Sequence, residues 1–196
     1  MTRPQPPQLP PPVLPLATTS INRSYHLGRI LGLRLTAETS AFVALIVLWV
    51  VLAVVGSQAL GLTGPDVVVG GALTVLLHVG LTLAHHLGHA LAAERTGYPM
   101  VGIHLWLLLA RSIYPANEPP LPAQVHIRRA LGGPIASTIL GVILGILALL
   151  LRPVGGMVYA MVVFLFLDNL LVFTLGAFLP VPIADGGTLR RWWPRK

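Results

Sequence analysis

Four long apolar stretches constrain the fold of this chain more than any motif does. The first lies between Glu38 and Asp66, and the others cover 67–93, 130–151 and 157–179. Each is long enough for a membrane-spanning helix, which needs about 20 predominantly apolar residues. Only 10% of the residues are charged, against roughly 25% in soluble domains. The sequence therefore predicts an all-α membrane protein with four transmembrane helices.

The basic residues predict the orientation of these helices. Short loops on the cytoplasmic side of a membrane collect Lys and Arg. With four spans and an inner N-terminus, every Lys and Arg except Arg152 falls on the inner side. We therefore predict that both termini are cytoplasmic. The formal net charge of +7 then reflects membrane topology, and we expect no nucleic-acid partner.

Composition also predicts the domain organisation. The segment 1–30 is rich in proline and lacks the apolar core of a signal peptide, so we expect a disordered cytoplasmic tail followed by one membrane domain over 31–196. The long inner loop, 94–129, contains the apolar run VGIHLWLLLA, which is too short to span and predicts a strand or a re-entrant segment. The chain has no cysteine, which excludes disulfides, thiol catalysis and cysteine-ligated zinc.

The second stretch ends in a histidine cluster, His85-His86-Leu87-Gly88-His89. Residues four apart lie on the same face of a helix, so His85 and His89 can offer two imidazole nitrogens to one metal ion. The alternative is that they pack as ordinary polar residues. Histidines inside a membrane helix need partners, which favours the metal.

A third ligand is expected from a carboxylate, and Asp185 is the best candidate. It lies in LPVPIADGG, where prolines end the fourth stretch and glycines let the backbone bend around the acid. In the four-span topology this loop and the histidines share one membrane boundary. The alternative is that Asp185 caps a turn at the helix exit.

These segments together resemble the site-2 protease family of intramembrane zinc metalloproteases. The family's His-Glu-x-x-His, Gly-Pro and Asn-x-x-Pro-x-Pro-x-x-Asp-Gly motifs correspond to HHLGHALAAERTGYP from His85, LGGPIAS from Leu131 and AFLPVPIADGG from Ala177. The resemblance implies zinc held by His85, His89 and Asp185, with a water in the open fourth position. It also implies hydrolysis of a transmembrane or membrane-adjacent protein substrate, so the expected partners are the lipid bilayer and a transmembrane protein.

Two positions depart from the family pattern, and a third differs more mildly. His86 occupies the place of the catalytic glutamate, Ala177 replaces the motif asparagine, and Ser137 stands where asparagine is common. Three roles are open for His86: general base, fourth metal ligand, or neither. The sequence accordingly supports two hypotheses. One is a zinc metalloprotease with reduced or lost proteolysis, and the other is a noncatalytic pseudoprotease that binds membrane helices or protein partners.

Other polar residues have several possible roles. His78 and Asp168 lie at similar depth, where a pair would serve packing or a proton route to the metal. Glu118 is the loop carboxylate that can fold back toward the metal, whereas His104 and His126 have no readable partner. A small transporter or channel would explain the buried histidines and aspartate, but it gives no reason for the Asp-Gly-Gly turn opposite the histidines.

Overall fold

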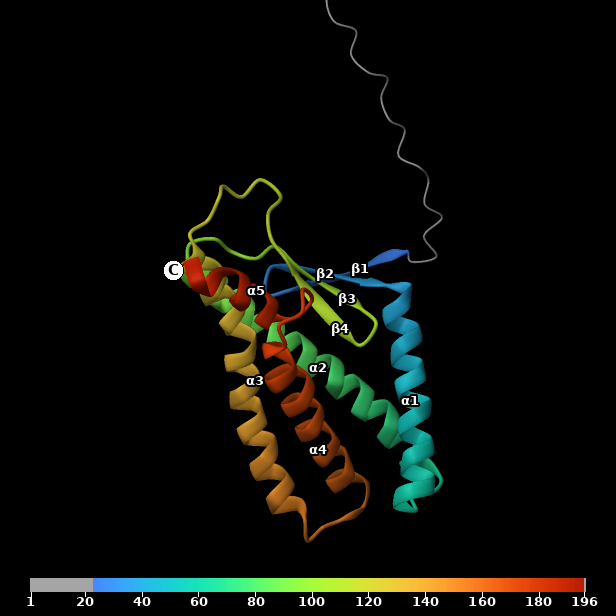
Figure 1. The fold of residues 1–196 in the computed structure, drawn as a ribbon. Helices are drawn as coiled ribbons and strands as arrows, with labels where there is room; N and C mark the ends of the chain where they lie inside the picture. The colour runs from blue at the N-terminus through green and yellow to red at the C-terminus, as the bar shows by residue number, and fades with distance from the viewer. Residues whose placement is uncertain (1–22, 196) are drawn as a thin grey trace, which may run out of the picture.

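The computed structural model describes residues 23–195, so most of the tail predicted over 1–30 lies outside the described residues. A small sheet covers one end of a bundle of long helices (Figure 1). The elements in chain order are β1 (Ser24–Ile30), β2 (Leu33–Glu38), α1 (Thr39–Leu60), α2 (Pro65–Arg95), β3 (Gly102–Trp106), β4 (Leu109–Ile113), α3 (Ala123–Leu151), α4 (Gly156–Asp168), the π-helix η1 (Asn169–Leu175), the 3₁₀ turn η2 (Gly176–Phe178), α5 (Asp185–Trp192) and the 3₁₀ turn η3 (Trp193–Arg195).

The predicted number of spans is confirmed. Four helical segments of the described chain are long and apolar enough to cross a membrane: α1, α2, α3 and the continuous segment Gly156–Phe178. The third helix begins at Ala123 rather than at residue 130, because a helix continues past the apolar boundary into its charged first turns. The fourth is irregular, since α4 passes into η1 and then η2. The apolar helices indicate an integral membrane protein.

The described residues are mostly helical, as predicted, but they also form a four-stranded sheet in the order β1-β2-β3-β4, where the sequence predicted only a short strand-like or re-entrant segment. β1–β2 and β3–β4 are antiparallel, whereas β2 and β3 are parallel and are connected through α1 and α2. The run VGIHLWLLLA forms β3 and the start of β4, as predicted. Ser24–Ile30, which the sequence analysis placed in the tail 1–30, is a strand paired with β2.

The sheet is attached to the end of α2 by an apolar core. Leu33, Ala93, Met100 and Ile103 form one buried cluster, which joins β2 and β3 to the last turns of α2. Ile103 and Ala93 are fully buried at its centre. Because the sheet is fixed to the helix that carries the histidine cluster, the hairpin β3–β4 has a defined position beside it (Figure 1).

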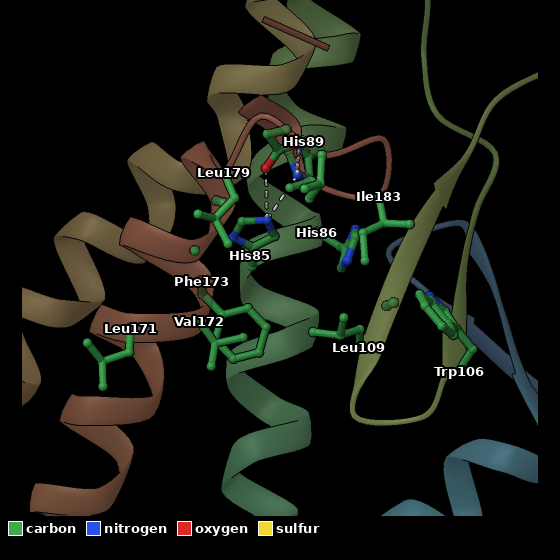
Figure 2. Close-up of a pocket in the computed structure, with 16 residues that line it drawn as sticks. His85, His86, His89, Trp106, Leu109, Leu171, Val172, Phe173, Leu179 and Ile183 are labelled. Carbon is green, nitrogen blue, oxygen red and sulfur yellow. Dashed lines mark hydrogen bonds and ion pairs between the residues drawn. The ribbon is translucent and has the colours of Figure 1, made fainter. Parts of the chain in front are cut away.

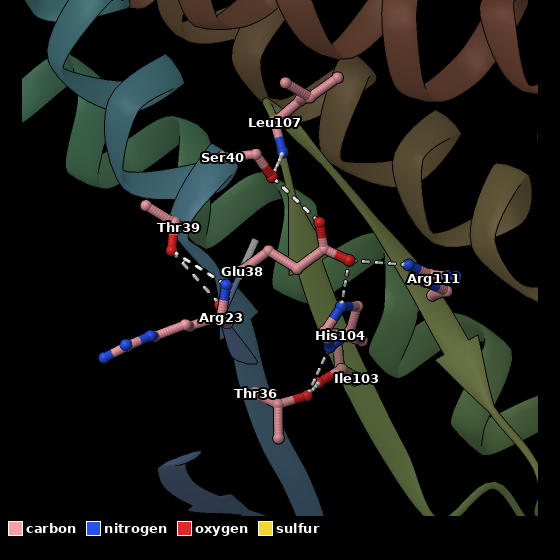
Figure 3. A network of polar contacts seen from close by, with 9 residues as sticks. All are labelled: Arg23, Thr36, Glu38, Thr39, Ser40, Ile103, His104, Leu107 and Arg111. Atoms are coloured by element: carbon pink, nitrogen blue, oxygen red, sulfur yellow. Dashed lines mark hydrogen bonds and ion pairs between the residues drawn. The ribbon is translucent and has the colours of Figure 1, made fainter. Parts of the chain in front are cut away.

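A polar network links the sheet to α1 (Figure 3). Glu38, the last residue of β2, accepts hydrogen bonds from His104 Nε2 at 3.0 Å, from Arg111 at 3.0 Å and from Ser40 at 3.2 Å. His104 Nδ1 also lies 2.8 Å from the Thr36 hydroxyl, so His104 does have partners. The hydrogen bond from His104 lowers the pKa of the Glu38 carboxyl below its usual value.

Candidate metal centre

The last turns of α2 place the histidine cluster inside the protein. His85, His86 and His89 are all buried, with at most 7% of each exposed. His85 and His89 lie one turn apart on the same face, and their Nε2 atoms are 3.1 Å apart. The helical spacing therefore brings two imidazole nitrogens to one point, as predicted.

Asp185 completes the group from the other end of the chain. Its two carboxylate oxygens lie 3.4 Å from His85 Nε2 and 3.3 Å from His89 Nε2. Asp185 is the first residue of α5, directly after the N-cap Ala184, and its carboxylate faces the two histidines. A Cβ on Gly186 would lie 2.3 Å from the Phe178 carbonyl oxygen, so α5 can approach the preceding loop this closely only with glycine. Among the described residues, His85, His89 and Asp185 form a group whose donor atoms all lie within 4.8 Å of one another.

Asp185 is suited to act as an anionic ligand. Its burial opposes ionisation, but hydrogen bonds with His85 and His89 outweigh burial and lower the pKa of the carboxyl to about 2. The carboxylate is therefore ionised across the physiological pH range.

The Nδ1 atoms of both histidines are held by α3, which orients the rings. His85 Nδ1 lies 2.9 Å from the Ser137 hydroxyl, and His89 Nδ1 lies 2.8 Å from the Arg129 carbonyl oxygen. The Gly133 amide also lies 3.2 Å from His89 Nδ1. The shorter contact is decisive, because a carbonyl only accepts, so His89 Nδ1 carries a hydrogen and donates it. Such bonds to Nδ1 fix the ring and its tautomer in metal sites.

This hydrogen placement provides a test of whether the group fits a metal. In the neutral imidazole of His89 the hydrogen is on Nδ1, so Nε2 presents a lone pair toward the Asp185 carboxylate and His85 Nε2. A metal ion between these donor atoms, which lie 3.1–3.4 Å apart, would take the place of the hydrogens that otherwise join the nitrogens to one another and to the carboxylate. Two imidazoles and a carboxylate are a typical zinc donor set. The residues therefore fit the metal that the sequence predicts.

Gly133 on α3 leaves the space in which the nitrogens meet. A Cβ at this position would lie 2.3 Å from His89 Nε2 and 2.5 Å from His85 Nε2. Any side chain would therefore occupy the point where the donor atoms converge. The Gly-Gly-Pro segment, noted in the sequence only as a motif, has a direct steric role.

His86 faces a different direction from the two candidate ligands. Its Nδ1 lies 3.0 Å from the Ser112 hydroxyl on β4, and its ring centroid is 5.3 Å from that of His85 and 5.4 Å from that of His89. When Nδ1 donates to Ser112, Nε2 retains a lone pair. His86 thus lies beside the candidate metal centre and is oriented by the sheet.

Two hollows meet at this group. An apolar cleft of about 330 Å³ opens between the hairpin β3–β4 and the segment η1–η2. Figure 2 shows its two walls, with Trp106 and Leu109 on one side and Leu171 and Val172 on the other. A second, polar hollow of about 300 Å³ shares His86, His89 and Asp185 with the cleft and is otherwise lined largely by polar side chains, including Ser112, Tyr114, Glu118, His126, Arg129 and Thr188. The candidate metal centre is therefore reached from an apolar side and from a polar side.

Arg129 connects the polar hollow to the histidines, a link that the sequence analysis missed. Its guanidinium donates to Glu118, at 3.1 Å for one pair of atoms, and lies 4.1 Å from the centre of the Tyr114 ring. Glu118 is therefore a partner of Arg129 and not a ligand substitute. Burial raises the pKa of Tyr114 to about 12 and keeps its hydroxyl protonated.

His126, expected to lack a partner, stacks on Trp192 with ring centres 4.1 Å apart.

Asn169 is a second residue that the sequence analysis did not connect with the site. It is fully buried at the start of η1, and its side-chain amide donates to the Ser137 carbonyl oxygen at 2.7 Å. Ser137 in turn holds His85. Ala177, at the motif position of asparagine, lines the apolar cleft without a polar group. An asparagine inside an apolar stretch is costly without a partner, and that cost was the available signal.

The described chain thus contains four helices long and apolar enough to cross a membrane, with a His-His-Asp group able to hold a metal ion at the end of one of them. Its fold is similar to that of a solved structure, the Site-2 Protease from Methanocaldococcus jannaschii. The match has a TM-score of 0.58 and 19% sequence identity, and it covers 86% of this chain and 70% of that chain. No protein-family model and no curated protein matches the sequence. The predicted resemblance is therefore supported at the level of the fold.

Proposed function

We propose that the protein is an intramembrane zinc metalloprotease of the site-2 type, with proteolysis that is reduced or lost because His86 replaces the usual glutamate. The observation that carries the proposal is the convergence of His85, His89 and Asp185 at the base of an apolar cleft. This arrangement on a site-2 protease fold suits a transmembrane or membrane-adjacent protein substrate.

The roles of the residues follow from their positions. A bound zinc ion would polarise the peptide carbonyl and lower the pKa of an attacking water. His85, His89 and Asp185 would hold that ion, and the apolar cleft would bind the substrate segment beside it. His86 Nε2 would accept the proton of the water and later donate it to the leaving amine. A protonated imidazole beside a cation is disfavoured by like charge, so His86 would be a weaker base than a carboxylate.

A noncatalytic pseudoprotease is the second candidate. It is favoured by Ala177, which places no hydrogen-bonding group where the family has asparagine, and by the Ser112 contact that ties His86 to β4. In this case the cleft binds a membrane helix or protein partner, and the ion stabilises the contact of α2 with α5.

We further propose that both termini are cytoplasmic. The parallel neighbours β2 and β3 flank α1 and α2, so these two helices cross and return to the same side. Reporter fusions at Lys196 and near Gly155 should report opposite sides of the membrane, with Lys196 cytoplasmic. An external C-terminus would contradict the proposal.

Zinc analysis and a cleavage assay on the purified protein test the function. We expect about one zinc per chain and a large loss of zinc in His85→Ala, His89→Ala and Asp185→Ala. His104→Ala is a matched control, because it removes a histidine from the sheet and should retain zinc. Cleavage of any of a panel of single-span substrates, abolished in Asp185→Ala, supports the protease. Full zinc with no cleavage supports the pseudoprotease, whereas unchanged zinc in all three variants contradicts both.

A further inference from the structure

His78 makes two hydrogen bonds that join three parts of the fold. It lies on α2, two turns before His85, and only 3% of it is exposed. Its Nδ1 is 2.8 Å from an Asp168 carboxylate oxygen, and its Nε2 is 3.0 Å from the Leu108 carbonyl oxygen. The pair with Asp168 that the sequence suggested is therefore present, and Leu108 is an additional partner.

The two partners of His78 lie directly beside the opposite walls of the apolar cleft in the chain. Leu108 lies in the turn between β3 and β4, next to Leu109 on one wall. Asp168 ends α4 directly before η1, whose residues Leu171, Val172 and Phe173 form the other wall. Figure 2 shows Leu109 on one side of α2, and Leu171 and Val172 on the other. The His78 ring also lies 5.8 Å from the Phe173 ring, so it contacts that wall directly.

We propose that His78 is a positioning residue that ties the two walls together and sets the width of the cleft. The meaning of this width for catalysis rests on the proposed function, but the tie itself is a property of the fold. A single imidazole bonded to both walls leaves neither of them free to move independently of α2.

The hydrogen-bond chemistry suits this position. The Leu108 carbonyl only accepts, so His78 Nε2 carries a hydrogen and donates it. At Nδ1 either an imidazolium donates to the Asp168 carboxylate or a carboxylic acid donates to a neutral imidazole. Both arrangements have no net charge, which lowers the cost of burying the pair among apolar helices. The tie is therefore stable without an additional counter-ion.

The buried threonines of α2 do not join separate elements in this way. The Thr74 hydroxyl donates to the Gly70 carbonyl oxygen of its own helix at 2.7 Å, and the Thr82 hydroxyl donates to the His78 carbonyl oxygen at 3.0 Å. Thr74→Val is therefore a matched control, because it removes a buried hydrogen bond from α2 without releasing a wall.

The distance between the walls can be measured with spin labels on Leu109→Cys and Leu171→Cys. The natural chain has no cysteine, so both labels are unique. In the full chain in lipid nanodiscs, we expect His78→Phe to give a longer or broader distance distribution, and Thr74→Val to give that of the parent. Asp168→Asn should keep the parent distribution, because an amide N–H can donate to His78 Nδ1.

His78→Phe leaves the buried Asp168 carboxylate unpaired and could therefore misfold, so a double variant serves as a second test. His78→Leu with Asp168→Leu leaves no buried polar side chain at this site, and it should show the same broadening as His78→Phe. An unchanged distribution in the double variant would overturn the proposal. A broadening of equal size in Thr74→Val would do so as well.

Cleavage kinetics provide a second readout. With a substrate that the parent cuts, His78→Phe should raise KM roughly threefold to tenfold, the effect of losing a hydrogen bond or two, while kcat changes less. The single variant Asp168→Asn should keep the KM of the parent, because its amide can still donate a hydrogen bond to His78. An equal KM in His78→Phe would overturn the link to substrate binding. Absence of cleavage in the parent would instead refute the protease, and the distance measurement would still decide on the tie.

Discussion

Replacing Gly133 by alanine should expel the metal by displacing the rings of the two histidines. The added Cβ would lie 2.3 Å from His89 Nε2 and 2.5 Å from His85 Nε2, whereas ordinary van der Waals contact begins at 3.4 Å. Each nitrogen must therefore retreat by about 1 Å. Metal–ligand distances are held to about ±0.2 Å, so the retreat is several times the tolerance of the site.

We expect the zinc affinity to fall at least roughly 100-fold, which corresponds to about 2.7 kcal/mol. Competition with a chromophoric chelator measures this value. Alanine favours a helix over glycine by about 1 kcal/mol, which offsets part of the strain at the histidines. With excess chelator, the melting temperature of Gly133→Ala should therefore fall only by the strain that remains. Gly80→Ala is the control, because a Cβ there meets no atom within 4 Å. A folded Gly133→Ala protein with the parent zinc affinity would refute the geometry argued for this centre.

Three further outcomes follow from the site and the sheet. His86→Glu should raise proteolysis by about 10²- to 10⁴-fold, with a further gain from Ala177→Asn, and an unchanged or lower rate in a protein that already cleaves well would show that His86 is a competent base. Ser137→Ala should weaken zinc binding roughly 10- to 100-fold by releasing His85 Nδ1. Chelator competition measures the change in affinity, and a smaller change would contradict this role of Ser137. Glu38→Gln should lower the melting temperature at pH 7, and the difference should shrink as pH falls below 4.5, because the lowered pKa of Glu38 stabilises the fold only while the carboxyl is ionised.

The spans were predictable because membrane insertion depends on a local sum of apolar residues. The strand Ser24–Ile30 was not, since its stability comes from pairing with β2 and its one arginine, Arg29, had a sufficient explanation in topology. Leu31 and Gly32, both with positive φ, form the turn between these strands, and the glycine was a usable but weak signal. Hydropathy also placed the start of α3 too late, because it marks where a helix enters the membrane and not where the helix begins.

The convergence of His85, His89 and Asp185 was predicted from helical spacing and from motif resemblance, both of which can be read from a sequence. The residues that orient these side chains could not be predicted in this way. Arg129 contributes a backbone carbonyl to His89, and any residue type could do that. Asn169 reaches the site only through the Ser137 carbonyl, a contact between two helices whose rotation the sequence leaves open.

The parallel pairing of β2 with β3 also governs how the chain is assembled during synthesis. Arg34 pairs with Gly102, so the inner strands of the sheet cannot meet until both α1 and α2 have been made and inserted. At roughly 5–20 residues per second, the ribosome needs about 3–14 s to produce the intervening segment. During this interval β2 can pair with β1 along one edge, while the edge that later binds β3 stays unpaired. The sheet can therefore be completed only after the second helix has returned to the side on which β2 lies.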